Sequence, residues 1–207
     1  MSTADPKETL VHYLQNARDA MVWKLDGLSE YDIRRPLTPT GTNLLGLVQH
    51  LASVEFGYLG ETFGRPGEHL RWHTEEADHN DDLWVIPEET REDIVGLYRR
   101  AWAHGAETIA ALDLDSPGEV PWWREERRQV TLHTILIHLL AETARHAGHA
   151  DIVRESIDGA AGVRADSSNL PDDGYDWAAL RARVEAAARA AAAPGNPSNL
   201  DQNENVF

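Results

Sequence analysis

Four long segments of this 207-residue chain carry apolar residues at every third or fourth position, which is the pattern of an amphipathic α-helix. The predicted helices cover residues 6–27, 43–63, 89–114 and 131–159. Helices of this length bury their apolar sides by packing against one another. The pattern therefore predicts an all-α fold, a four-helix bundle with long connectors.

Residues that favour helix ends lie at the borders of these segments. Asp5 and Thr131 can each accept a hydrogen bond from the first turn of a helix, and Thr42 or Asn43 can do so for the second helix. Gly159 follows the fourth periodic segment, where a left-handed residue commonly ends a helix. These signals support the borders that the periodicity predicts.

The composition changes after the fourth helix. We expect a helical domain over residues 1–162 and a C-terminal extension over residues 163–207. Within the extension, the alanine-rich stretch from residue 177 has strong helix propensity, and the polar residues that follow it predict a disordered tail.

Charge and composition exclude several classes of function. The formal charge is −16, from 19 Lys and Arg against 35 Asp and Glu, so we expect no binding to nucleic acid or to anionic membranes. The sequence shows no signal peptide and no apolar run long enough to cross a bilayer, which predicts a cytoplasmic protein. Because the chain has no cysteine, a metal site would have to use histidine and carboxylate. A homodimer through an exposed helix face or the alanine-rich helix is compatible with this pattern.

The fourth predicted helix carries an unusual set of polar residues on one side. His138, Glu142, His146 and His149 are spaced by four, four and three residues, so they project to the same side as the apolar interior positions. Burying a carboxylate among imidazoles is costly unless something compensates for the lost hydration. A divalent cation compensates because it binds both kinds of group directly.

A metal site also needs a ligand from a second helix. His50 lies at an inward position of the second predicted helix, and bundle cores build metal sites from facing helices. Three protein ligands with an open position would form a site of catalytic type. The pattern leaves two simpler interpretations open: an inward histidine is usually a hydrogen-bonded core residue, and Glu142 with His146 can be an ordinary hydrogen-bonded pair.

Four tryptophans lie in the predicted connectors and could either wall a pocket at the metal end of the bundle or pin the connectors onto it. They are Trp72, Trp84, Trp122 and Trp123.

Two separated segments carry a family resemblance. They read "LLGLVQHLASVE" at residues 44–55 and "LHTILIHLLAETARHAGHADIVRESIDG" at residues 132–159. The chain resembles the DinB-like superfamily from about Pro6 to Gly162, above all the actinobacterial branch called mini-circle-protein-like. This resemblance implies a four-helix bundle with up-down-down-up connections and a divalent metal in its core.

The resemblance also implies a ligand set. In the related mycothiol-dependent maleylpyruvate isomerases, the metal is held by a histidine of the second helix and by a glutamate followed four residues later by a histidine. In this sequence those positions are His50, Glu142 and His146. His138 and His149 lie outside this set, and we expect them to act in catalysis by contacting the substrate or accepting a proton.

The implied reaction is that of a metal-dependent thiol S-transferase or isomerase-like enzyme. Its cosubstrate would be mycothiol or a similar small thiol, and the second substrate would be an electrophile. We expect zinc as the metal, with nickel, iron or manganese as alternatives. Two other functions remain open on the same residues. One is a metal-dependent hydrolase that uses bound water, and the other is a metal-binding stress-response protein without turnover.

Overall fold

The computed structural model describes residues 5–74, 76–168, 170–171 and 174–192. The chain divides at residue 169 into two compact units. Among these described residues, the first unit holds five α-helices and a small sheet, and the second holds one α-helix. The α-helices are α1 (Pro6–Trp23), α2 (Glu30–Arg34), α3 (Leu44–Glu55), α4 (Arg91–Ala111), α5 (Leu132–Asp158) and α6 (Trp177–Ala192).

The prediction of a mostly helical fold is confirmed, and the predicted caps are present. The side chains of Asp5, Asn43 and Thr131 accept hydrogen bonds from the first turns of α1, α3 and α5. Gly159 ends α5 in the left-handed conformation, with φ of 81°. The predicted boundary between residues 162 and 163 stays a prediction.

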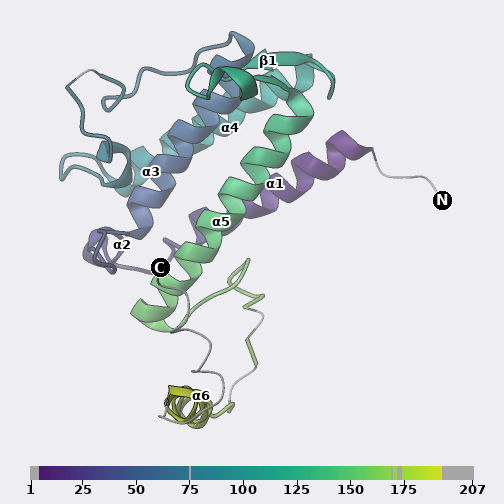
Figure 1. Ribbon diagram of the computed structural model, residues 1–207. Helices are drawn as coiled ribbons and strands as arrows, with labels where there is room; N and C mark the ends of the chain where they lie inside the picture. The colour runs from purple at the N-terminus through teal and green to yellow at the C-terminus, as the bar shows by residue number, and fades with distance from the viewer. Residues whose placement is uncertain (1–4, 75, 169, 172–173, 193–207) are drawn as a thin grey trace, which may run out of the picture. The chain divides into compact units, whose positions relative to one another are not determined.

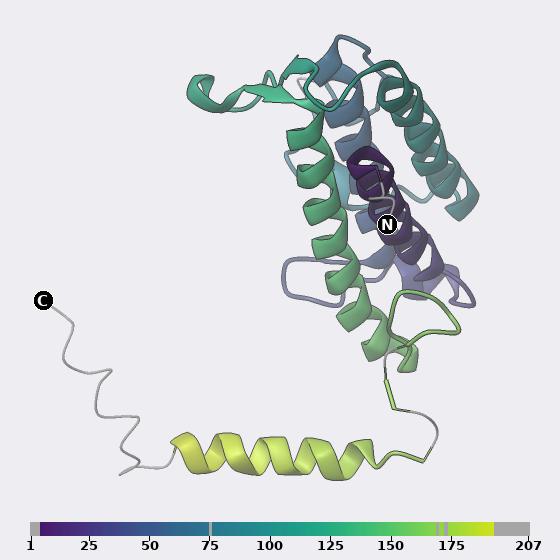
Figure 2. The same cartoon turned by 90° about the vertical axis from the view of Figure 1, so that its right-hand side faces the viewer.

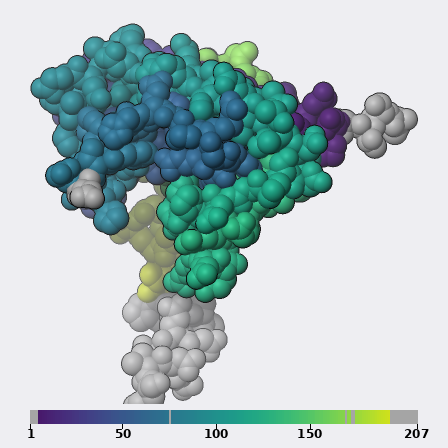
Figure 3. Space-filling view, turned by 90° about the horizontal axis from the view of Figure 1, so that it is seen from above, coloured from purple at the N-terminus to yellow at the C-terminus, as the bar shows by residue number. Residues whose placement is uncertain are grey.

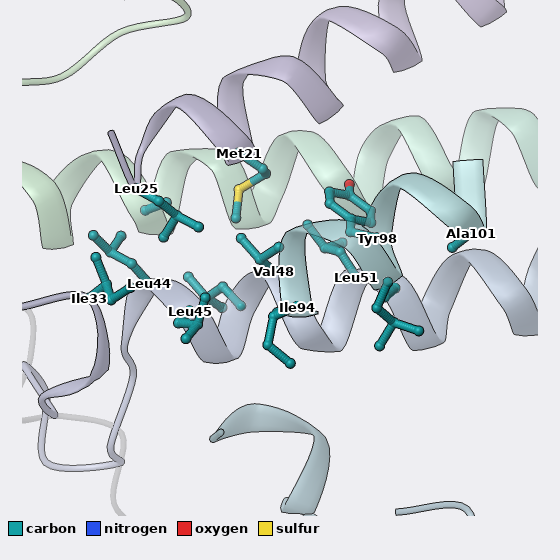
Figure 4. Packing of buried hydrophobic residues seen from close by; sticks show 14 of the residues in the cluster. Met21, Leu25, Ile33, Leu44, Leu45, Val48, Leu51, Ile94, Tyr98 and Ala101 are labelled. Carbon is teal, nitrogen blue, oxygen red and sulfur yellow. The ribbon is translucent and has the colours of Figure 1, made fainter. Parts of the chain in front are cut away.

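The long helices of the first unit pack in pairs. Helix α1 runs along α5, α3 runs along α4, and α3 also contacts α5 (Figures 1 and 2). Between these helices lies an apolar core, in which Met21, Val48, Ile94 and Tyr98 meet (Figure 4). Within the described residues, no helix is long and apolar enough to cross a membrane.

Two segments predicted as irregular connectors contain short elements. Helix α2 lies in the connector after α1, and the connector before α5 forms an antiparallel hairpin of β1 (Pro117–Glu119) and β2 (Gln129–Thr131), with Gly118 opposite Val130. Strands of three residues are too short to give an alternating pattern, which explains why sequence periodicity missed them.

The second predicted helix changes its pitch before it ends. After α3 the backbone continues as a π-helical turn (Phe56–Gly60) and a 3-10 turn (Glu61–Phe63), and Gly64 ends it with φ of 67°. A Cβ on Gly57 would lie 3.0 Å from the ring of Trp122, and one on Gly60 would lie 2.7 Å from a backbone oxygen. Glycine therefore permits both close contacts. The 3-10 turn Glu61–Phe63 contacts β1, and in the view from above the blue residues of this region lie beside the teal hairpin (Figure 3).

The connector between α3 and α4 is anchored on α3. The side-chain amide of Asn43 donates to the carbonyl of Leu83, and that of Gln49 donates to the carbonyls of Asp81 and Trp84. A Cβ on Gly46 would lie 1.9 Å from the Leu83 carbonyl oxygen, so the two backbones touch at this glycine. These contacts hold the 3-10 turn Asp81–Leu83 against the helix that carries His50.

A buried ion pair links α1 to α3. The Arg18 guanidinium donates Nε and Nη2 to the two oxygens of Glu55, each at 2.6 Å, and both side chains are almost fully buried. Burial raises the pKa of the nearby Tyr98 hydroxyl well above its usual range, with a further contribution from the charge of Glu55.

In the second unit, the predicted alanine-rich helix is present as α6, with no buried residue along it. The segment predicted to be a disordered tail, residues 193–207, lies outside the described residues.

Candidate metal centre

His50, Glu142 and His146 converge between two neighbouring helices. His50 is on α3, and Glu142 and His146 are one turn apart on α5. Each offers one ligand atom, and these three atoms all lie within 4.8 Å of one another. The structure thus brings together the three side chains that the resemblance named as ligands.

The contacts within this cluster are close. Glu142 Oε1 lies 3.1 Å from His146 Nε2 and 3.8 Å from His50 Nε2. The two imidazole rings stand edge to face, with their centroids 4.9 Å apart. All three side chains are partly buried, with between 14% and 29% of each side chain exposed.

Asp82 contacts the cluster from the connector. Its Oδ2 lies 2.6 Å from Nδ1 of His50. When Nδ1–H donates to this carboxylate, Nε2 keeps its lone pair and faces Glu142, which is the arrangement that orients metal-binding histidines in proteins. Sequence reasoning missed Asp82 because it follows α3 by a long irregular stretch that has no periodic pattern.

The surroundings of His146 favour the neutral form of its imidazole. Burial lowers its pKa below the ordinary histidine value, and the neighbouring His50 lowers it further against the opposing effect of Glu142. Its buried Nδ1 has no hydrogen-bond partner among the described residues. A neutral imidazole is the form that binds a metal ion.

This set of donor atoms fits a divalent cation. Two imidazole nitrogens and one carboxylate oxygen are ligands that zinc accepts, with a fourth position left open. Tetrahedral coordination with bonds of about 2.1 Å separates two donor atoms by roughly 3.4 Å. The separations of 3.1 and 3.8 Å from Glu142 lie on either side of that value.

A cleft of about 680 Å³ opens beside the cluster. The turn after α3, the start of α5, the connector after α3 and the hairpin all contribute to it. Its lining residues are His50, Ser53, Val54, Gly57, Tyr58, Glu61, His73, Trp122, His138 and Glu142.

The two predicted catalytic histidines lie in different surroundings. His138 lines the cleft, where its ring centroid is 4.5 Å from that of Tyr58 and 5.2 Å from that of Trp123. The predicted interior position is wrong for His149, which is exposed, with its ring 5.4 Å from that of His146, and is not among the lining residues of the cleft. Their catalytic roles stay predictions.

The tryptophans of the connectors divide between the two expected roles. Trp122 lines the cleft, whereas Trp72 is buried and donates Nε1–H to the Ser53 hydroxyl, which pins the connector to α3. Glu61 and His73 also line the cleft, and no spacing in the sequence pointed to them.

The fold and the cluster together define a mostly helical protein with a candidate metal site between neighbouring helices. The chain belongs to the mycothiol-S-transferase family, whose model matches residues 9–159. This match confirms the predicted relationship to DinB-like, mycothiol-related proteins. A comparison with curated proteins finds no match.

Proposed function

We propose that this protein is a metal-dependent thiol S-transferase that joins mycothiol, or a similar small thiol, to an electrophile. The convergence of His50, Glu142 and His146 beside a cleft, in a chain of the mycothiol-S-transferase family, carries the proposal. Helices α1, α3, α4 and α5 would form the DinB-like four-helix bundle with up-down-down-up connections. The packing of α1 on α5 and of α3 on α4 and α5 supports that arrangement.

His50, Glu142 and His146 would hold the ion, with zinc as the first expectation and nickel, iron or manganese as alternatives. When bound, a divalent cation lowers the pKa of a coordinated thiol and so supplies the nucleophilic thiolate at neutral pH. The chain itself has no cysteine that could act as the nucleophile.

The residues around the cluster would perform the remaining tasks. Asp82 would hold the ring of His50 in one orientation and one tautomer. His138 faces the cleft and would accept the proton that the thiol loses. His149, exposed beside His146, would contact the outer part of the thiol or its solvent shell.

Elemental analysis of the purified protein, combined with a thiol-dependence assay, tests this function. We expect about one divalent ion per chain and turnover of 1-chloro-2,4-dinitrobenzene that requires both the metal and mycothiol. Ester or amide hydrolysis without thiol would favour the hydrolase. A loaded site with no turnover over a broad panel of electrophiles would favour the binding protein, and a chain that holds no metal would refute the proposal.

A further inference from the structure

Aromatic rings form one wall of the cleft beside the candidate metal ligands. The ring centroid of Tyr58 lies 5.2 Å from that of Trp122 and 4.5 Å from that of His138. Trp122 keeps 49% of its surface exposed, so part of its ring is free to contact a ligand. Stacked or edge-on contacts between aromatic rings favour binding beyond simple burial of apolar area.

This aromatic wall is fixed by its neighbours. Trp123 donates its Nε1–H to the Tyr58 hydroxyl at 3.0 Å, and its ring also stands edge-on to that of His138. Trp122 packs against Gly57, where a Cβ would lie only 3.0 Å from its ring. These aromatic side chains are therefore already positioned, and the binding of a flat ring would not have to order them.

The charge of the cleft limits the ligand further. Within the described part of the chain, the lining residues include the carboxylates of Glu61 and Glu142 but no lysine or arginine. Glu61 is exposed at the cleft and has no ion-pair partner among the described residues. The two positive charges of a divalent ion are cancelled by the carboxylate of Glu142 and by a bound thiolate. The carboxylate of Glu61 then makes the surroundings of the electrophile negative.

We infer that the cleft takes a neutral aromatic electrophile, with its ring against Trp122 and Tyr58, and discriminates against anionic ones. This inference rests on the proposed function for its reaction, although the binding preference does not. It also sets the transferase apart from the isomerase-like alternative, because maleylpyruvate is an anion and no lysine or arginine among the described lining residues is available to pair with it.

With an aryl halide the reaction balances as a substitution. The thiolate sulfur forms a bond to the ring carbon that carries the halogen, and the carbon–halogen bond then breaks. The halide leaves with the bonding electron pair, and the thiol proton passes to His138 and on to solvent. The products are an aryl thioether, a halide ion and a proton, and no oxidant or reductant takes part.

Binding of unreactive compounds tests the preference without any turnover. By isothermal titration calorimetry on zinc-loaded protein saturated with mycothiol, so that the thiolate occupies the open metal position, we expect 1,3-dinitrobenzene to bind about tenfold or more tightly than 3,5-dinitrobenzoate, which adds one negative charge to the same ring. Trp122→Ala should weaken binding of dinitrobenzene about three- to tenfold and Trp122→Phe should restore most of it. Tyr13→Ala, which removes an exposed ring of α1 outside the cleft lining, is the matched control and should have no effect.

Kinetics with a matched reactive pair provides the second test. Relative to the uncatalysed reaction with mycothiol, kcat/KM for 1-chloro-2,6-dinitrobenzene should exceed that for 4-chloro-3,5-dinitrobenzoate, which differs only by its carboxylate, about tenfold or more. Glu61→Gln should narrow this ratio severalfold by improving the anionic substrate. Trp122→Ala should raise KM for the aryl chloride more than it raises KM for iodoacetamide, which has no ring.

The outcomes separate the two proposals. Equal affinity for the neutral and anionic rings, an inert Trp122→Ala change, or displacement of dinitrobenzene by mycothiol would overturn the inference about the cleft. Absence of thiol-dependent turnover with any electrophile, together with the expected binding of dinitrobenzene, would instead refute the transferase function and leave the binding preference intact.

Discussion

Asp82 on the connector after α3 lies 2.6 Å from Nδ1 of His50, so a carboxylate far along the chain fixes the ring of a candidate metal ligand. Both side chains are about one-fifth exposed, which leaves their interaction only partly screened by water. Carboxylates in this position orient the ring and raise the basicity of the nitrogen that binds the metal. The affinity of the site for a metal therefore depends on a residue that is not itself a ligand.

Replacing Asp82 by Asn should weaken zinc binding about 10- to 100-fold, since the amide keeps the size of the side chain but loses its charge. Competition with a chelating dye would measure the affinity. Glu76→Gln removes one negative charge from the same connector at an exposed position and serves as the control. Equal losses in the two variants would mean that general charge, and not the contact with His50, sets the affinity.

Gly46 should be as important to the site as Asp82, although it contacts no ligand. A Cβ at this position would lie 1.9 Å from the Leu83 carbonyl oxygen, so Gly46→Ala must push the connector away from α3 and move Asp82 from His50. We expect a lower midpoint of urea unfolding together with weaker zinc binding. Gly96→Ala, where the nearest atom is the movable end of Arg100 at 3.3 Å, should keep its zinc affinity and gain up to about 1 kcal/mol of helix stability. Unchanged zinc affinity in Gly46→Ala would show that the connector does not position Asp82.

The sequence predicted the features of the fold that depend on local patterns. Apolar periodicity identified the long helices, and short-range hydrogen bonds explain why Asn43, Thr131 and Gly159 marked helix ends correctly. The π-helical turn Phe56–Gly60 was missed because periodicity does not specify helix pitch where glycines permit close contacts with other segments.

The candidate site was predictable only in its helical part. Glu142 and His146 share a helix face by spacing alone, and His50 lies at an inward phase of its own helix. Asp82, Glu61 and the exposed part of Trp122 reach the cleft through contacts between irregular segments, which no spacing rule encodes. The choice of Glu142 and His146 among the polar residues of α5, as partners of His50 on α3, came from the family resemblance and stays a prediction.

The predicted ligand set implies different results for neighbouring side chains of α5. His146→Ala or Glu142→Ala should abolish stoichiometric zinc, because each removes one of the three converging donors. His149→Ala should leave zinc bound and change turnover, since its exposed ring lies beside His146 and outside the converging set. Mass spectrometry of the native proteins would measure the metal content. Loss of zinc from the His149 variant to the same extent would show that a different set of side chains binds the ion.

The ion pair of Arg18 and Glu55 should contribute to stability in proportion to its burial. Glu55→Gln leaves the guanidinium without its charged partner in an interior with almost no water, so we expect a loss of about 3–5 kcal/mol in the free energy of unfolding. The double change Arg18→Met with Glu55→Leu removes both charges and should cost much less than the single change.

Glu68→Gln is the matched control, because Arg100 also donates two hydrogen bonds to Glu68 but both side chains are roughly half exposed. Water screens this surface pair, so its loss should cost less than about 1 kcal/mol. Urea unfolding followed by circular dichroism would compare the variants. Similar losses from Glu55→Gln and Glu68→Gln would mean that burial does not determine the strength of the link between α1 and α3.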